Sequence, residues 1–300
     1  IAVPATIRLV AQARTALLDA AADFAAHEVA QHREAATALR TATPDLADAA
    51  PPVIAGLDAA ETRALLQDVP AAYRTEINDV LLAALAQTFA EWSGQPRLLI
   101  DLRGHGREPI GGDIDLSRTV GWLTSIYPLQ LDLSGGEGPR EALLAVKEQL
   151  RRVPNHGAGF GVLRYLAAEP IAAQLRALPA PELSFNYLGQ FDQVLAGDGF
   201  GLAEPSSDPA NGLWSPRYLI EVQGGVVGGQ LRMAWKYSPA HYRRATIARL
   251  AGQFGAALRA LIAHCQSAEA GGYTPADFPM ANLNQQALDT ILAQVRKAQG

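Results

Sequence analysis

The chain has 300 residues, of which 49% are hydrophobic and 18% are charged, and its net charge is -5. This length and composition describe a globular protein with one large domain or two subdomains, and they exclude a disordered chain. The negative charge, with no stripe dense in lysine and arginine, argues against nucleic acid as the main partner. Cys265 is the only cysteine, which excludes an intramolecular disulfide and a cysteine-based zinc site and fits a reducing compartment.

Targeting signals and familiar cofactor motifs are missing from the sequence. No uninterrupted apolar run is long enough to span a bilayer, and the first residues lack the order of a secretion signal, so we expect a cytoplasmic protein with no membrane partner. His27 and His32 are five residues apart and do not form HExxH, and GGVVGG is not followed by GK[ST]. We expect neither a metal nor a nucleotide. Because the first residue is Ile1 and not methionine, we expect a piece of something longer.

The N-terminal 52 residues differ in composition from the rest of the chain. They are rich in alanine, with apolar positions at helical spacing, which predicts one or two amphipathic helices that end near Pro44. Residues 45–52 are typical of a linker. The sequence leaves open whether this helical segment is native to the domain that follows.

Helices and strands then alternate along the chain. Asp58, with Glu61 three residues later, predicts the N-cap of a first helix. A second helix carries apolar residues on one face from Ile77 onward and ends at Gly94, and Pro139 opens a third. Further helices are expected at residues 247–264 and at the C-terminus, where Leu288, Ile291, Leu292 and Val295 share one side. Strands are expected at residues 98–102, within 119–133, and at 183–188, 218–222 and 230–237, with a long loop at 196–216 and a hairpin turn in VQGGVVGGQ.

Four dense blocks of sequence occur in one order. They read LIDLRGHGREPI (residues 99–110), DIDLSRTVGWLTSIYPLQL (113–131), HGAGFGVLRYL (156–166) and LSFNYLGQFD (183–192). Together they resemble the epimerization domains of nonribosomal peptide synthetases, which belong to the condensation-domain superfamily. The resemblance runs from about residue 57 to about residue 295. It implies an α/β fold similar to chloramphenicol acetyltransferase, mainly its C-terminal subdomain at residues 53–278, followed by an exit linker and short helix at 279–300.

The resemblance also implies a function. Such domains invert the Cα centre of an aminoacyl or peptidyl thioester carried by a peptidyl carrier protein, whose phosphopantetheine arm enters a tunnel between two subdomains. The implied partners are that carrier, adjacent synthetase domains or a separate N-terminal half, and the chain itself is expected to bind no cofactor. Two departures matter. The HHxxxDG motif of the family's N-terminal half is absent, and Arg103 stands where the usual EGHGRE block has its glutamate. An isomerase activity would therefore require completion by an N-terminal half.

Epimerization needs two proton-transfer groups on opposite sides of Cα and a donor for the enolate oxygen. Arg103 stays protonated and has no acceptor, so it can stabilise an enolate or pair with Asp101 or Glu108, but it cannot act as a base. The resemblance assigns Asn186 and Tyr187 to the tunnel wall near the thioester.

The other candidate residues each have a structural alternative. Arg118 can face the tunnel or pair with Asp113 or Asp115. His105 can shape the tunnel wall or be satisfied by backbone. Trp122, Tyr127 and Phe185 are candidates for substrate contact, or else they pack in the core. Smaller expectations are that Gly104 and Gly106 permit a tight backbone, that Arg107 pairs with Glu108, and that Arg164 lies at the surface or faces the carrier.

Two other functions remain open at this point. A non-catalytic condensation-like domain that recruits a tailoring enzyme or positions a carrier protein would keep the scaffold blocks and lose catalytic residues. A peptide-bond-forming condensation domain is the second alternative, and the SRTVGW and FNYLGQ blocks argue against it because they are more similar to the epimerization branch.

Overall fold

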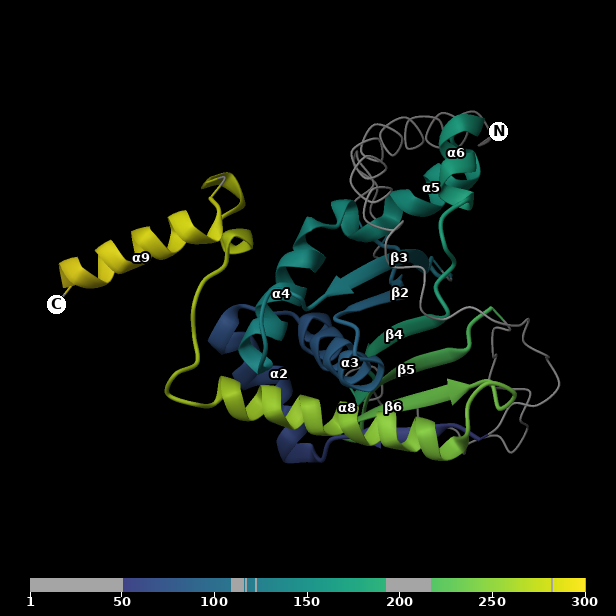
Figure 1. The fold of residues 1–300 in the computed structure, drawn as a ribbon, viewed down its shortest axis with the longest axis horizontal. Coiled ribbons are helices and arrows are strands. Elements are labelled where there is room, and N and C mark those ends of the chain that lie inside the picture. Colours follow the sequence, from purple (N-terminus) through teal and green to yellow (C-terminus); the bar gives the residue numbers. More distant parts are fainter. Residues whose placement is uncertain are drawn as a thin grey trace.

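The protein folds into a mixed β-sheet covered by helices (Figure 1). The computed structural model describes residues 51–108, 116, 118–121, 123–192, 217–281 and 283–299. Within these residues the strand order is β1-β6-β5-β4-β2-β3. The central neighbours β2, β4 and β5 run parallel, and the outer pairs are antiparallel. The strands are β1 (Val53–Gly56), β2 (Arg97–Gly104), β3 (Ser125–Asp132), β4 (Leu183–Gln190), β5 (Ile220–Val227) and β6 (Gln230–Tyr237).

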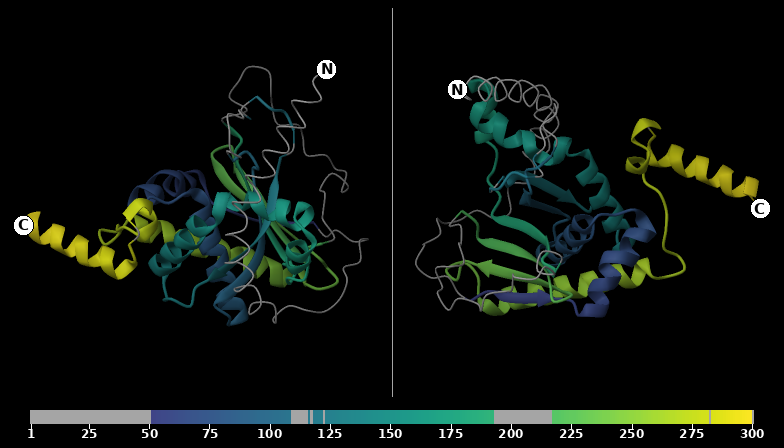
Figure 2. Two further views of the ribbon diagram at one scale, coloured as in Figure 1. Left: turned by 90° about the horizontal axis from the view of Figure 1, so that it is seen from above. Right: turned by 180° about the vertical axis from the view of Figure 1, so that it is seen from behind.

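One face of the sheet is covered by a layer of helices. Helices α2, α3, α4 and α8 pack on one another and against this face, as the views in Figures 1 and 2 agree. Helix α5 packs beside the edge strand β3, with α6 next to it. The helices are α2 (Ala59–Tyr73), α3 (Ile77–Ser93), α4 (Pro139–Arg152), α5 (Ala158–Leu166), α6 (Glu169–Arg176), α8 (Arg244–Cys265) and α9 (Gln285–Gln299). The expected α/β layered fold is confirmed.

Local signals determine the helix ends as expected. The Asp58 side chain accepts hydrogen bonds from the first turn of α2, and the Glu61 carboxylate accepts one from the Asp58 backbone, which completes a capping box. Helix α3 ends at Gly94, whose φ of 69° is the left-handed conformation that glycine adopts without strain.

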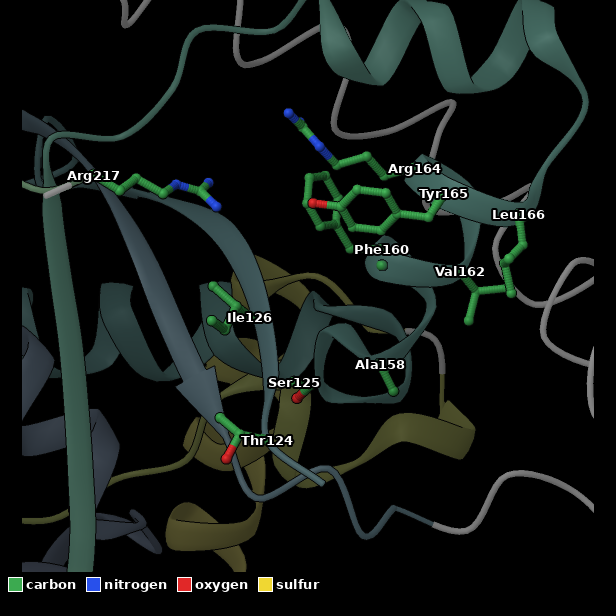
Figure 3. Close-up of a pocket in the computed structure, with 11 residues that line it drawn as sticks. Thr124, Ser125, Ile126, Ala158, Phe160, Val162, Arg164, Tyr165, Leu166 and Arg217 are labelled. Atoms are coloured by element: carbon green, nitrogen blue, oxygen red, sulfur yellow. The ribbon is translucent and has the colours of Figure 1, made fainter. Parts of the chain in front are cut away.

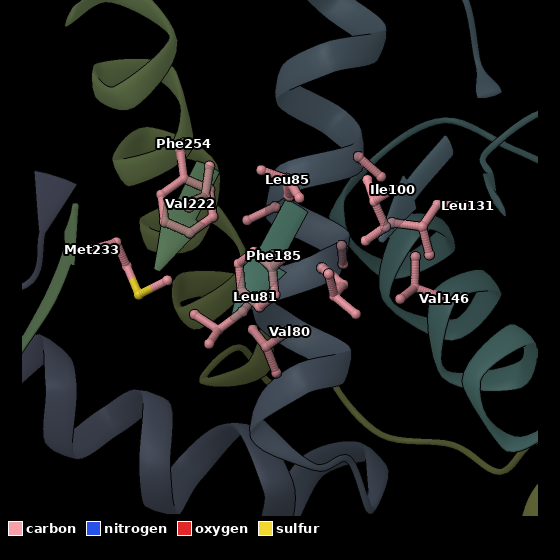
Figure 4. Packing of buried hydrophobic residues seen from close by; sticks show 14 of the residues in the cluster. Val80, Leu81, Leu85, Ile100, Leu131, Val146, Phe185, Val222, Met233 and Phe254 are labelled. Carbon is pink, nitrogen blue, oxygen red and sulfur yellow. The ribbon is translucent and has the colours of Figure 1, made fainter. Parts of the chain in front are cut away.

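The hydrophobic core lies between the helix layer and the sheet. Phe185, Val222 and Met233 point from neighbouring strands toward α3 and α8 (Figure 4). Trp235 on β6 has no exposed surface, and its ring lies 6.2 Å from that of Phe89 and 5.7 Å from that of Phe254. Because strand side chains alternate between faces, the neighbours of these residues along each strand lie on the opposite, open face of the sheet.

The β5–β6 hairpin is tighter than the sequence indicated. The turn is formed by Gly228 and Gly229 alone, both with positive φ, whereas Gly224 and Gly225 lie within β5. A Cβ atom at Gly224 would lie 1.9 Å from the carbonyl oxygen of Arg232. Gly224 therefore allows the two strands to approach closely. In the sequence, a glycine with this role cannot be told from a glycine that forms a turn.

The HGAGFGVLRYL block begins with a tight backbone turn, as expected. Asn155 and His156 have φ near 50°, and Gly157 has a φ of 77°. A Cβ at Gly157 would fall 2.1 Å from the ring of Tyr127, so only glycine fits here. The helices α5 and α6 that follow were not predicted, since both are short and two glycines in α5 hide its helical pattern.

The C-terminal segment is attached to α4 and then leaves the body. The buried Lys147 ammonium donates to Asp277 Oδ1 at 2.7 Å and to the Tyr73 carbonyl at 2.8 Å. Beyond this point α9 extends away from the sheet and its helices (Figure 1). The predicted terminal helix is confirmed, but Ile291 and Val295 remain partly exposed while Leu288 is buried.

Two expectations lie outside the described residues: the helices of residues 1–50 and most of the loop at 196–216. In the part of the chain that the structure describes, no helix is both long and apolar enough to cross a membrane.

Candidate functional site

The open face of the sheet carries a cluster of charged side chains on its central strands. On β2, Leu102 faces the core, so Asp101 and Arg103 on either side of it face outward. On β5, Glu221 lies between the core residues Ile220 and Val222. Three charged residues are thereby brought to one surface by simple strand alternation.

Arg103 is held by an acidic residue that the sequence did not single out. Its Nη2 donates to Glu221 Oε1 at 3.2 Å, and the side chains are 22% and 4% exposed. The guanidinium also lies 5.8 Å from the ring centre of Tyr218. The sequence offered Asp101 and Glu108 as possible acidic partners of Arg103, and the structure gives Glu221 as the acidic partner instead. Asp101 on β2 pairs with Ser184 on β4, and Ser184 pairs with Glu221 on β5. Glu221 therefore lies level with Asp101, two strands along the sheet from β2.

Asp101 has other partners. It is 1% exposed and accepts hydrogen bonds from the Tyr218 hydroxyl at 2.7 Å and from Arg217 Nη2 at 2.8 Å. Burial raises the pKa of Asp101 above its ordinary value, while the Tyr218 hydrogen bond and the nearby arginines oppose that rise. Burial and the Asp101 charge together raise the pKa of Tyr218 well above its usual range, so this hydroxyl is a donor and not a base.

The GHGRE loop is organised by its backbone. His105 is 71% exposed on its side chain, and its Nδ1 accepts a hydrogen bond from the Arg107 amide at 2.9 Å, which is the backbone-satisfied alternative. Arg107 donates to the carbonyls of Leu116 and Gly121, so the expected Arg107–Glu108 ion pair is wrong. A Cβ at Gly106 would meet the Leu123 carbonyl at 1.5 Å, which confirms the tight backbone.

The FNYLGQ strand divides its candidate residues between two faces. Asn186 lies on the open face next to Arg103, since Leu102 pairs with Phe185 in the parallel β2–β4 ladder. Tyr187 packs against the core on the helix side, its hydroxyl is buried without a hydrogen bond within the described residues, and burial raises its pKa. One strand therefore cannot present both Asn186 and Tyr187 to the same surface.

The remaining candidate residues do not gather at this site. Phe185 has no exposed surface and Tyr127 is 4% exposed, so both side chains pack in the hydrophobic core. Arg118 is exposed at the surface. Its possible partners Asp113 and Asp115, and the candidate Trp122, lie outside the described residues.

A pocket of about 510 Å³ adjoins the charged cluster. Its walls are the first residues of β3, one side of α5 and the Arg217 side chain (Figure 3). Ile126 on this wall pairs with Arg103 across the β2–β3 ladder, so the pocket and the cluster share a border. The sequence pointed to Arg164 in this wall but not to Arg217, which comes directly after residues that the structure does not describe.

Glu221, Arg217 and Tyr218 were missed by sequence reasoning. For Glu221 a signal existed, because a carboxylate flanked by Ile220 and Val222 in a strand predicts a charged partner across the sheet. No pattern in the sequence marked Arg217 or Tyr218 as neighbours of Asp101.

Comparison with known proteins decides the family. A family model described as "Condensation domain" matches residues 30–283 of this sequence. The chain belongs to the condensation-domain family. It is 48% identical over 251 residues to a linear gramicidin synthase of Brevibacillus parabrevis, covering 83% of this chain and 3% of that protein. It is also 37% identical over 241 residues to gramicidin S synthase 1 of Brevibacillus brevis. That match covers 77% of this chain and 22% of the relative.

Solved structures agree with this assignment. The epimerization domain from the third module of tyrocidine synthetase B is 32% identical, with a TM-score of 0.66, covering 84% of this chain and 58% of that one. The X-domain from teicoplanin biosynthesis is 19% identical with a TM-score of 0.56, which is a likeness of fold alone. The condensation-domain chain therefore spans a small share of its synthetase relatives and over half of the solved epimerization domain.

Proposed function

We infer that this condensation-family chain is part of an epimerization-type domain of a nonribosomal peptide synthetase, and that the open face of its sheet contacts a carrier-bound aminoacyl or peptidyl thioester. The observation that carries this inference is the parallel β2–β4 pairing, whose last pair, Leu102 with Phe185, is followed by Arg103 of the RGHGRE block on β2 and by Asn186 of the FNYLGQ block on β4. Two motifs some 80 residues apart in sequence thus supply adjacent side chains to one surface. The 32% identity to a solved epimerization domain supports the same branch of the family.

The charges of this surface favour binding over proton abstraction. Arg103 offers N–H donors and no acceptor, and Asn186 offers both a donor and an acceptor. Such groups can hold a thioester carbonyl and stabilise negative charge that develops on its oxygen. The Glu221 carboxylate is buried and bonded to Arg103, which stands in the place of the family's usual glutamate. In our proposal the chain therefore holds the thioester without exchanging its Cα proton.

A second candidate function is a non-catalytic condensation-like domain that positions a carrier protein or recruits a tailoring enzyme. The Arg103–Glu221 ion pair favours it, because a basic side chain tied to a buried carboxylate stabilises a fixed surface. Peptide-bond formation is a weaker candidate, since the likeness to two solved condensation domains is 15–16% in identity and concerns the fold alone.

We propose residues 53–278 as the unit that forms this surface and residues 279–300 as an exit segment. The core draws on residues from β1 to α8, and the Lys147–Asp277 bond attaches the chain just before the proposed boundary. Helix α9 lies beyond that attachment and away from the sheet (Figure 2).

The test measures carrier binding and proton exchange together. The 300-residue chain is mixed in heavy water with a carrier protein loaded with L-aminoacyl thioesters, and deuterium at Cα is followed by mass spectrometry against a sample without the chain. We expect the carrier to be retained by the immobilised chain and Cα deuterium to stay at the level of the control. Exchange above that level would contradict the proposal, and so would the absence of carrier binding.

A further inference from the structure

The chain after α8 is fixed to the body at two points that share one residue, Tyr73 at the end of α2. The Tyr73 hydroxyl lies 2.8 Å from Nε2 of His264, in the last turn of α8, and the two rings stack. The Tyr73 carbonyl accepts a hydrogen bond from the Lys147 ammonium, which also donates to Asp277. The chain therefore leaves α8 beside Tyr73 and returns to Tyr73 through Lys147 before α9 begins.

Between these two points the chain turns back onto the helices. We call residues 271–278 the strap. Gly271 and Gly272 have φ of 127° and 150°, a conformation that glycine adopts without strain, and they turn the chain toward α2. The ring of Tyr273 lies under the Arg74 guanidinium, whose centre is 4.1 Å from that of the ring. The first half of the strap therefore lies against the end of α2.

Two consecutive residues of α4 bind the second half of the strap. Lys147 donates to Asp277 Oδ1 at 2.7 Å, and the two side chains are 1% and 8% exposed. Glu148 Oε1 accepts a hydrogen bond from the Ala276 amide at 2.9 Å. The other oxygen of Asp277 accepts the Thr274 amide at 2.8 Å, which closes the turn of the strap. One carboxylate thus both forms the turn and attaches it to α4.

A buried ion pair adds little net stability but fixes a position. The cost of removing two charges from water offsets most of their attraction, so apolar side chains would stabilise the strap as well. Apolar side chains would also let the strap slide, whereas an ammonium and a carboxylate meet in one register only. The Lys147–Asp277 pair therefore determines which residue of the strap lies on α4.

We propose that the strap fixes the place and direction in which α9 leaves the body, that Lys147 is the residue that pins it, and that the strap can open as one unit while the body stays folded. A flexible linker of about 20 residues would let α9 begin anywhere within roughly 25 Å of the end of α8. The strap reduces this range to one place beside α2 and α4, from which α9 extends away from the sheet (Figure 1).

The position of the strap outside the core supports its opening as a unit. The apolar core contains none of residues 271–278, and the contacts of the strap are polar or aromatic and lie at the ends of α2 and α4. Segments with few buried apolar contacts open at a lower free energy than the core does. The inference concerns the exit segment and not the open face of the sheet, so its test is independent of carrier binding.

The experiment measures hydrogen exchange of backbone amides in the 300-residue chain by mass spectrometry. In Lys147→Met we expect exchange of the strap to rise roughly tenfold or more, because a hydrogen bond between charged groups is lost. Peptides from β4 and β5 should keep the wild-type rates. Asp277→Asn should give the same pattern, and because it changes the strap and not the body, it remains informative even where Lys147→Met fails to fold.

A matched control breaks a different ion pair of α4. Arg151→Met removes the partner of the buried Asp79 on α3 and leaves every contact of the strap in place, so strap exchange should stay at the wild-type rate. Unchanged strap exchange in both Lys147→Met and Asp277→Asn would overturn the proposal. Strap exchange that rises only together with that of β4 and β5 would overturn it as well, since the strap would then be part of the body.

A second measurement follows α9 itself. Spin labels are attached through Glu91→Cys on α3 and Gln294→Cys on α9, in a Cys265→Ser background, and the distribution of distances between them is measured by pulsed electron paramagnetic resonance. We expect one narrow distribution with Lys147 present and a broad one after Lys147→Met. Distributions of equal width in the two chains would overturn the role of the strap in fixing α9.

Discussion

The two faces of the sheet are held together by different interactions. On the helix-covered face, Phe185, Val222 and Trp235 are completely buried among apolar neighbours. On the open face, Glu221, next to Val222 on β5, bonds Arg103 on β2, and β4 lies between these two strands. Apolar packing is non-directional and tolerates many partners, whereas an ion pair requires one particular partner at one distance. The first face therefore determines whether the chain folds, and the second determines what the surface can bind.

The largest expected effect comes from breaking the helix-covered face. Trp235→Ala should lower the free energy of unfolding by about 3–5 kcal/mol, because it removes a large ring packed between Phe89 and Phe254. Urea unfolding followed by circular dichroism measures this. A loss below about 1 kcal/mol would mean that the helix layer is not packed on the sheet as described.

The next effect comes from breaking the ion pair of the open face. Glu221→Gln should cost about 1–3 kcal/mol, because it leaves a partly buried guanidinium without its carboxylate. A double-mutant cycle with Arg103→Met should show a coupling energy of about 0.5–3 kcal/mol. The exposed Arg97–Asp132 pair is the control, with an expected coupling of about 0.2–1 kcal/mol. Additive effects at Arg103 and Glu221 would contradict the pairing.

Asp101, on the open face, makes the free energy of unfolding depend on pH. Because burial raises its pKa, the folded chain holds this proton more tightly than the unfolded chain does, and stability should fall as pH rises from 3.8 to the folded pKa and be level above it. The unfolding free energy of the wild type minus that of Asp101→Asn should decrease through this window, by about 1.4 kcal/mol for each pKa unit. A difference that grows with pH would show that the pKa is lowered instead.

The smallest effect is expected at an apolar residue on the open face. Ile54 on β1 is 58% exposed, whereas its neighbour Ala55 is buried. Ile54→Thr should change the unfolding free energy by less than about 0.5 kcal/mol, since it empties no packed volume. Urea unfolding midpoints of the two chains should nearly coincide. A cost comparable to that of Trp235→Ala would mean that the open face is itself packed.

Most of the fold followed from local patterns in the sequence. The Asp58–Glu61 capping box, the Gly94 stop and the alternation of Leu231, Met233 and Trp235 each act over a few residues, so each could be recognised before the structure was known. Helices α5 and α6 could not, because they are short and rely on tertiary packing, α5 against β3 and α6 against α5.

The site could be predicted only in part. Arg103 and Asn186 were identified through their sequence blocks, and their adjacency required the β2–β4 pairing. The partners Glu221 and Arg217 lie more than 110 residues from Arg103 and Asp101, a separation over which no periodicity operates. Tyr187 and Phe185 looked like site residues because they belong to a matching block, yet strand alternation turns both toward the core.

The binding role of the open face is tested most directly by mapping which face of the sheet a carrier-bound arm touches. A carrier protein whose pantetheine arm ends in a photoreactive diazirine is irradiated with the chain, and the cross-linked peptides are identified by mass spectrometry. We expect cross-links to the segments of the open face and its pocket, in β2, β4 and α5. Cross-links confined to α2, α3 or α8 on the covered side would contradict that role.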